Sequence, residues 1–142
     1  GALLIAGVFF AFSNFVMSGL GRLPTNQGVA AMNSINVTVI NPLFMAVFLG
    51  TGLAAAALTV TNFSSLPEPD AIKIITGALV YLIGAIGVTM IFNVPLNDAL
   101  TAAGDDGAAL WPDYLKTWTM WNHVRCLASL TAGALMFSAL SA

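Results

Sequence analysis

The sequence predicts an all-α integral membrane protein, a single transmembrane domain of residues 1–142 folded as an antiparallel four-helix bundle. The composition is the first reason: 58% of the residues are hydrophobic, 7% are charged and the mean hydropathy is +0.91, which excludes an ordinary soluble domain. The second reason is that the chain divides into four long apolar runs, each offering the ~20 residues that a membrane-spanning helix needs. Segments rich in proline, glycine and asparagine separate these runs.

The expected spans follow from the runs and from the residues that interrupt them. They are residues 1–20, 29–60, 71–93 and 112–142. The second run would make ~48 Å of helix, longer than the ~30 Å apolar core of a bilayer, so we expect it to bend at Pro42, whose ring displaces a backbone carbonyl. We expect Pro112 in the first turn of the fourth helix, where no donor is lost. The chain between Asn93 and Trp111 is expected to leave the membrane.

Short connections between successive spans predict an up-and-down topology. The first loop and the segment before Trp111 then lie at one end of the bundle, and the turn over Thr61–Asp70 lies at the other end with both termini. Arg22 and Lys116 mark the first end and Lys73 marks the second. This small excess of positive charge favours a cytoplasmic orientation of the Trp111 end.

The first and third spans carry two further expectations. Because the chain begins with glycine rather than methionine, we expect a further N-terminal segment, and we expect residues 1–20 to be a span rather than a cleaved signal. Gly77, Gly84 and Gly87 permit close contacts of the third span with neighbouring helices.

We expect the membrane that holds this integral membrane protein to be a bacterial plasma membrane.

The stretch from Trp111 to Arg125 concentrates the candidate functional side chains. It holds all three tryptophans, the only histidine and one of the four basic residues. Projection at ~100° per residue puts five side chains within one third of the helix circumference: Tyr114, Trp118, Trp121, Asn122 and Arg125. One interpretation is a pocket for a flat aromatic ligand, closed by Arg125 and Asn122; the other is an interfacial aromatic belt. Arg125 favours the pocket, because it lies about thirteen residues into the helix.

Asparagines from all four expected spans lie at similar depth. They are Asn14, Asn33, Asn36, Asn93 and Asn122, with Asn97 just beyond the third span. Inside a bilayer such amides must find hydrogen-bond partners. They can converge with Arg125 on one polar cavity, or they can join helices to one another without a further role. The sequence leaves both interpretations open.

His123 projects onto the other side of the fourth helix. An imidazole can accept a proton near neutral pH, so His123 is a candidate general base, although a structural hydrogen bond to a neighbouring helix fits the pattern equally well. With one histidine, one cysteine and carboxylates only in loops or at helix starts, we expect no metal site. We expect no cofactor either, so the purified protein should be colourless, which absorption spectroscopy and metal analysis can check.

Four segments together resemble the anthrone oxygenase-like family of small four-helix membrane proteins. They are Gly7–Ser13, Met32–Asn36 with Asn41–Phe44, Asn93–Asn97 and Trp118–Arg125. The resemblance covers nearly the whole chain. Its most specific parts are the turn Asn-x-Pro-x-Asn and the run Trp-Asn-His-x-Arg.

The resemblance implies oxidation of a polycyclic anthrone to an anthraquinone by dioxygen, in some pathways without metal or flavin. Trp118 and Trp121 would hold the rings, with Tyr114, Asn36 and Asn14 as further contacts. Arg125 would stabilise the substrate anion with Asn93, Asn97 or Asn122, and His123 would remove the carbon-bound proton. The expected substrate is an apolar polycyclic or quinone-like molecule.

A second hypothesis requires no catalysis. The chain can be an accessory subunit, or a component that binds lipid or quinone, in a larger membrane complex. The partners we expect are therefore membrane lipid, a hydrophobic small molecule and either further copies of the chain or a larger complex. The net charge of -2 gives no indication of a nucleic-acid partner.

Overall fold

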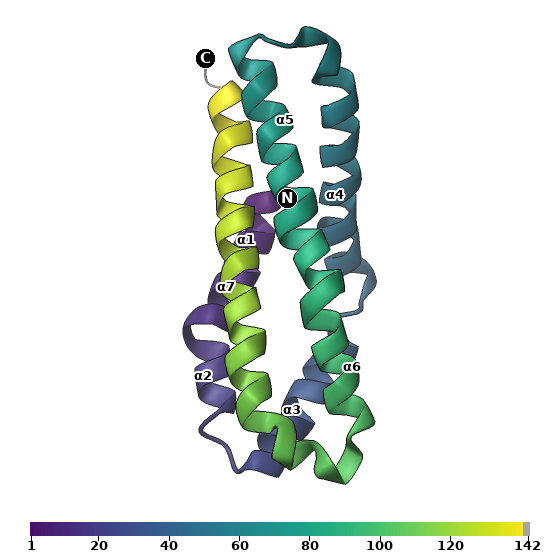
Figure 1. The fold of residues 1–142 in the computed structure, drawn as a ribbon, viewed down its shortest axis with the longest axis vertical. Coiled ribbons are helices and arrows are strands. Elements are labelled where there is room, and N and C mark those ends of the chain that lie inside the picture. Colours follow the sequence, from purple (N-terminus) through teal and green to yellow (C-terminus); the bar gives the residue numbers. More distant parts are fainter. Residues whose placement is uncertain (141–142) are drawn as a thin grey trace.

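Four long helical rods and one shorter helix between the first two make up the protein, which we describe from a computed structural model covering residues 1–140 (Figure 1). Within those residues every regular element is helical. The rods long and apolar enough to cross a membrane are Ala2–Leu20, Pro42–Ser65, Pro69–Ala102 and Gly104–Leu140. These observations confirm the predicted all-α, antiparallel membrane bundle, and the protein is an integral membrane protein.

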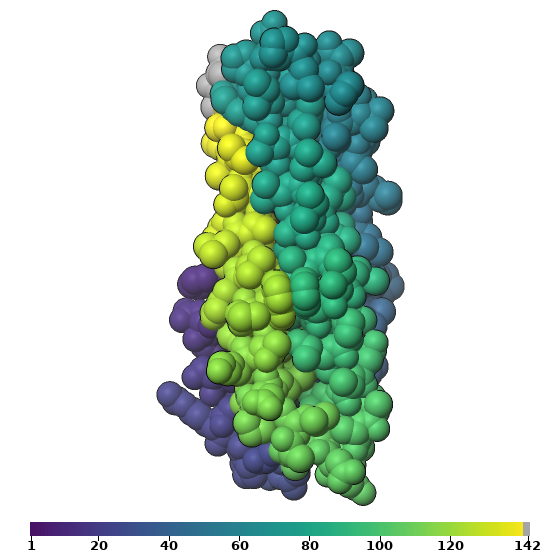
Figure 2. Space-filling view, viewed as in Figure 1, coloured from purple at the N-terminus to yellow at the C-terminus, as the bar shows by residue number. Residues whose placement is uncertain are grey.

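The first rod occupies only half of the bundle's height. It consists of α1 (Ala2–Ala11), a π-helical segment (Phe12–Val16) and α2 (Met17–Leu20). Gly1 packs against Thr51, in the middle of the second rod, and Figure 1 shows the N-terminus at about the middle of the bundle, with the purple helix running downward from it; Figure 2 agrees. The prediction that both termini lie with the Thr61–Asp70 turn is therefore wrong for Gly1. Nineteen residues span ~28 Å, about half the ~51 Å of the longest helix.

The second apolar run forms two helices instead of one bent helix. α3 (Thr25–Thr38) and α4 (Pro42–Asn62) are separate, and a 3-10 turn (Phe63–Ser65) extends the second. Asn41 is extended, as the residue before a proline prefers to be, and its side chain accepts a hydrogen bond of 3.0 Å from the Phe44 amide. The predicted kink at Pro42 is therefore wrong, because Pro42 is the first residue of a capped helix.

The third rod continues past the point where we expected it to end. It runs through α5 (Pro69–Tyr81), two π-helical segments (Leu82–Gly87 and Thr89–Asn93) and α6 (Val94–Ala102). Pro95 is the second residue after the second π-helical segment, in the first turn of α6, where the hydrogen-bond register has just changed, so its missing donor does not end the helix. The expected end of the helix at Asn93 is therefore wrong, because nine more helical residues follow.

The fourth rod begins earlier than predicted. A 3-10 turn (Gly104–Asp106) leads into α7 (Gly107–Leu140), so Pro112 lies inside the helix rather than in its first turn. The reversal between α6 and α7 occurs at Gly104, whose φ of 52° is accessible to glycine at little cost. Because this turn is so tight, the helix restarts before Pro112. The last two residues of the expected span 112–142 lie outside the described residues.

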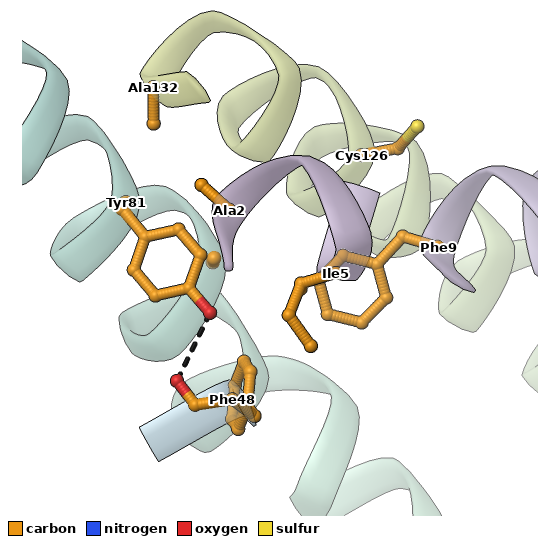
Figure 3. Close-up of a cluster of buried hydrophobic side chains, with 8 residues drawn as sticks. Ala2, Ile5, Phe9, Phe48, Tyr81, Cys126 and Ala132 are labelled. Carbon is orange, nitrogen blue, oxygen red and sulfur yellow. Dashed lines mark hydrogen bonds between the residues drawn. The ribbon is translucent and has the colours of Figure 1, made fainter. Parts of the chain in front are cut away.

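Two buried clusters form the core, one in each half of the bundle. Figure 3 shows the upper cluster, where Ile5 and Phe9 of α1 meet Phe48 of α4 and Tyr81 of α5. The Tyr81 hydroxyl donates a hydrogen bond of 3.1 Å to the Phe48 carbonyl. In the lower cluster, Trp111, Tyr114 and Trp118 of α7 are buried with residues of α2, α3 and α6. α7 therefore contributes to both clusters.

Small residues bring the third rod against α7, as the glycine positions suggested. A Cβ atom at Gly77 would lie 3.0 Å from the Ala132 carbonyl oxygen, and one at Gly84 would collide with the Ala128 side chain. At Gly87 the nearest atom to such a Cβ belongs to the same rod, Leu82 O at 3.5 Å. Gly77 and Gly84, but not Gly87, therefore form the close helix contacts.

Replacement of Gly84 by alanine should destabilise the bundle by about 1–3 kcal/mol, because the new methyl group overpacks the contact with Ala128. Gly50→Ala is the matched control, since nothing lies within 4 Å of a Cβ at Gly50 and alanine is the better helix former. Thermal unfolding in detergent measures both. Equal melting temperatures for the two variants would contradict this packing.

Candidate functional site

Arg125 lies in the interior of the bundle, near the middle of α7. It is 5% exposed, and at 1.5 Å per residue it is ~27 Å from the start of the helix and ~22 Å from its last described residue. Its guanidinium carbon lies 4.3 Å from the centre of the Phe9 ring and 4.9 Å from that of Trp118. The cation is therefore held between two aromatic faces rather than extended toward lipid headgroups.

Two hydrogen bonds complete the surroundings of Arg125. Nη1 donates to the Thr89 hydroxyl at 3.1 Å and Nη2 donates to Oδ1 of Asn122 at 2.8 Å. Among the described residues no carboxylate pairs with it. Each charge-assisted hydrogen bond contributes ~1.5–3 kcal/mol and each desolvated cation–π contact about 2, which together exceed the ~2.5–3.5 kcal/mol that insertion scales assign to a central arginine.

Asn122 carries this network to the first rod. Its Nδ2 donates to the Phe9 carbonyl at 2.7 Å and to the Ser13 hydroxyl oxygen at 2.8 Å. Asn122 is fully buried, and both of its amide hydrogens and its carbonyl oxygen have partners. Arg125 and Asn122 together therefore join the first, third and fourth rods.

Two of the polar side chains that contact Arg125 and Asn122 come from π-helical segments. Ser13 lies in Phe12–Val16, and Thr89 is the first residue of Thr89–Asn93. Such segments displace side chains from their α-helical directions and occur often at functional sites. The irregular backbone thus brings both hydroxyls to the Arg125–Asn122 pair.

A second polar cluster joins the third rod to α7 around Trp118. Asn97 Oδ1 accepts hydrogen bonds of 2.8 Å from the Tyr114 hydroxyl and from the Trp118 indole, and Asn93 Nδ2 donates to the Trp118 carbonyl at 3.2 Å. The Tyr114 ring stacks on Trp111 and Trp118. Most of the predicted aromatic stripe is therefore used in packing.

Three buried polar atoms beside Tyr114 and Trp118 have no hydrogen-bond partner. They are Asn93 Oδ1, Arg125 Nε and Asn36 Nδ2; the Asn36 side chain lies close to the Tyr114 hydroxyl. Buried polar atoms without partners are exceptions in folded proteins. Spare hydrogen-bonding capacity is thus concentrated in this part of the interior.

Three predicted site residues lie elsewhere. Asn14 is exposed, so the predicted convergence of asparagines from all four rods is wrong for Asn14; its neighbour Ser13 faces Asn122 instead. Trp121 does not join Trp118 and stacks on Phe92 of the third rod, with ring centres 3.6 Å apart. His123 is exposed and makes no hydrogen bond to residues 1–140, so the alternative of a structural hydrogen bond is wrong.

An open groove runs along the surface between the first rod and α7. Its polar lining includes Ser13, Arg22, Lys116 and His123, and its apolar lining includes Met17, Leu115 and Met120. Its volume of about 560 Å³ lies within the ~300–1,000 Å³ range of small-molecule sites. A second cavity beside Asp113 and Tyr114 measures about 150 Å³, below that range.

Sequence reasoning missed this groove because it depends on the position of the first rod beside α7. In the sequence, the groove was indicated by the expected position of Arg22 and Lys116 at the same end of the bundle. The groove brings together two of the four lysine and arginine residues and the only histidine. Within the described part of the chain, no three His, Cys, Asp or Glu side chains come together as metal ligands.

Replacement of Arg125 by lysine should lower the free energy of unfolding by about 2–3 kcal/mol. An ammonium group cannot lie flat between two rings and bond to Thr89 and Asn122 with the same geometry. Arg22→Lys is the control, because Arg22 is exposed and exposed charges contribute little to stability. Thermal unfolding in detergent measures both variants. If Arg125→Lys and Arg22→Lys both melted at the temperature of the unmodified protein, the described contacts of Arg125 would be contradicted.

Comparison with known proteins gives one match. The sequence profile of a family described as anthrone oxygenase matches residues 37–135, a region that contains α4 to α6 and most of α7, including Asn93, Asn97 and the run from Trp118 to Arg125. Searches of curated proteins and of solved structures gave no match. Since the profile covers more than half of the chain, this integral membrane protein belongs to the anthrone oxygenase family.

Proposed function

We propose that the protein is an oxygenase of a bacterial plasma membrane that oxidises an apolar, anthrone-like polycyclic molecule with dioxygen. One observation carries the proposal: the groove brings His123, Lys116 and Arg22 to an otherwise largely apolar wall at the surface of the bundle. Membership of the anthrone oxygenase family supports the reaction class. The groove supplies the groups that this reaction needs.

The groove suits a flat apolar substrate that reaches it from the bilayer. Met17, Leu115 and Met120 offer apolar contacts, and the flexible thioether side chains adapt to a ring system. Lys116 and His123 are seven residues apart on α7, which places them ~10 Å apart along its axis. The groove therefore extends from the charged end of the bundle toward its apolar middle.

The first chemical step is removal of a proton from the methylene carbon of the substrate. His123 accepts the proton, the carbon–hydrogen bond breaks, and its electron pair spreads over the rings onto the ketone oxygen. The positive charges of Lys116 and Arg22 stabilise the resulting anion. Among the described residues that line the groove none is acidic.

The anion then reacts with dioxygen. Overall, the methylene group and one dioxygen molecule give a ketone and one water molecule, so one oxygen atom enters the product and the other leaves as water. Carbon loses four electrons and dioxygen gains four. The co-reactant is dioxygen itself, and the balance requires no further reductant.

In this proposal Arg125 and Asn122 act behind the groove. Arg125 is enclosed by Phe9 and Trp118, and Asn122 is fully buried, whereas His123 next to them faces the groove. We therefore assign substrate contact to the groove rather than to Trp118 and Trp121. The buried pair fixes the position of the wall.

His123→Gln should reduce kcat by at least about a hundredfold, the contribution typical of a general base, while the protein stays folded because His123 is exposed. The measurement follows oxygen consumption and quinone absorbance with anthrone and the purified protein in detergent. Asp113→Asn, an exposed position of α7 outside the groove, is the control.

Two outcomes would contradict this proposal. If His123→Gln turned over anthrone like the control variant, His123 would not be the base. If the unmodified protein neither consumed oxygen nor formed quinone, and copurified with a stoichiometric partner, the accessory-subunit hypothesis would replace the oxygenase.

A further inference from the structure

The orientation of the Asn122 amide follows from its partners. A guanidinium group has only hydrogen-bond donors, so the Asn122 atom that contacts Arg125 Nη2 at 2.8 Å must be the carbonyl oxygen. The amide nitrogen therefore faces the Phe9 carbonyl and the Ser13 hydroxyl. A backbone carbonyl can only accept, which agrees with this assignment.

This orientation determines the role of the Ser13 hydroxyl. An amide nitrogen has no acceptor, so Ser13 Oγ accepts the 2.8 Å hydrogen bond and its own proton points elsewhere. Thr89 also accepts a bond from the buried network, but its proton is used, since it donates to the Ala85 carbonyl at 2.7 Å. Ser13 makes no such bond to a carbonyl of its own helix. Its proton remains free to donate.

The free proton belongs to a side chain that lines the groove. Ser13 is half-buried in the π-helical segment Phe12–Val16 and forms part of the same wall as His123. Ser13 thus contacts the buried network through its oxygen, belongs to the groove wall, and has a proton that the network does not use. No other residue both bonds to Asn122 through its side chain and lines the groove, among those the structure describes.

We propose that Ser13 donates a hydrogen bond to the ketone oxygen of the ligand in the groove, and that the Arg125–Asn122 pair positions Ser13 for this role. The inference rests on the proposed function and extends it, because it names the side chain that recognises the ketone oxygen of the substrate. Hydrogen bonds in a chain polarise one another, so the cation at its inner end makes Ser13 a stronger donor. The bond strengthens further as deprotonation moves negative charge onto the ketone oxygen.

If Ser13 had only a structural role, its substitution would affect ligand binding differently. If its only task were to accept the bond from Asn122, its removal would disturb the groove for every ligand alike. A donor to the ligand matters only for a ligand with an acceptor. Two probes of the same three-ring shape, anthraquinone with ketone oxygens and anthracene without them, separate these cases.

The experiment measures the binding of anthraquinone and anthracene to the full chain in detergent, by quenching of tryptophan fluorescence. Ser13→Ala should weaken anthraquinone binding about tenfold, the effect of one lost hydrogen bond, and leave anthracene binding unchanged. Ser13→Thr keeps the hydroxyl and should bind anthraquinone within about twofold of the unmodified protein. Asn14→Ala changes the exposed neighbour and serves as the control.

The inference is overturned if Ser13→Ala weakens both probes equally, if it leaves anthraquinone binding intact, or if Ser13→Thr loses anthraquinone binding as Ser13→Ala does. Binding of neither probe by the unmodified protein would instead overturn the proposed function, and the inference with it. Melting temperatures of all variants, measured in the same detergent, identify a change that acts through unfolding.

Discussion

The contact between the Arg125 guanidinium and the Asn122 amide holds together three of the four rods. Arg125 reaches Thr89 of the third rod and the Phe9 ring of the first, and Asn122 reaches the Phe9 carbonyl and Ser13. In an apolar environment a cation raises the free energy of insertion unless electron-rich groups surround it. Here two aromatic faces and two oxygens supply that surrounding without a carboxylate. The packing of the first rod against α7 is therefore coupled to the solvation of one buried charge.

The same contact explains how one turn of α7 provides both the buried Arg125–Asn122 pair and part of the groove wall. Consecutive residues of an α-helix point ~100° apart, so Asn122 faces the interior while His123 faces the groove. The first rod closes the arrangement, because the π-helical segment presents Ser13 to both sides. A shift of this rod would move the groove wall and the buried network together. Stability and ligand recognition are thus coupled at Ser13.

The sequence predicted the four apolar rods, the common end of Arg22 and Lys116 and the position of Arg125 inside the bundle, because these depend on composition, helical spacing and chain alternation. Details that depend on hydrogen-bond register were not predictable in this way. Pro42 starts a helix because Asn41 caps it, and the third rod continues through Pro95 because a π-helical segment precedes it. A π-helical segment also turns Ser13 rather than Asn14 toward Asn122, which no regular 3.6-residue projection gives.

A double-mutant cycle tests the central contact most directly. The variants are Arg125→Met, Asn122→Leu and their combination, and the measured quantity is the free energy of unfolding in detergent. If the two side chains stabilise each other as described, each single variant leaves a buried polar group without its partner, and the double variant should lose about 1.5–3 kcal/mol less than the sum of the single losses. Strictly additive losses would contradict the account, because they would mean that Arg125 and Asn122 contribute independently to the bundle.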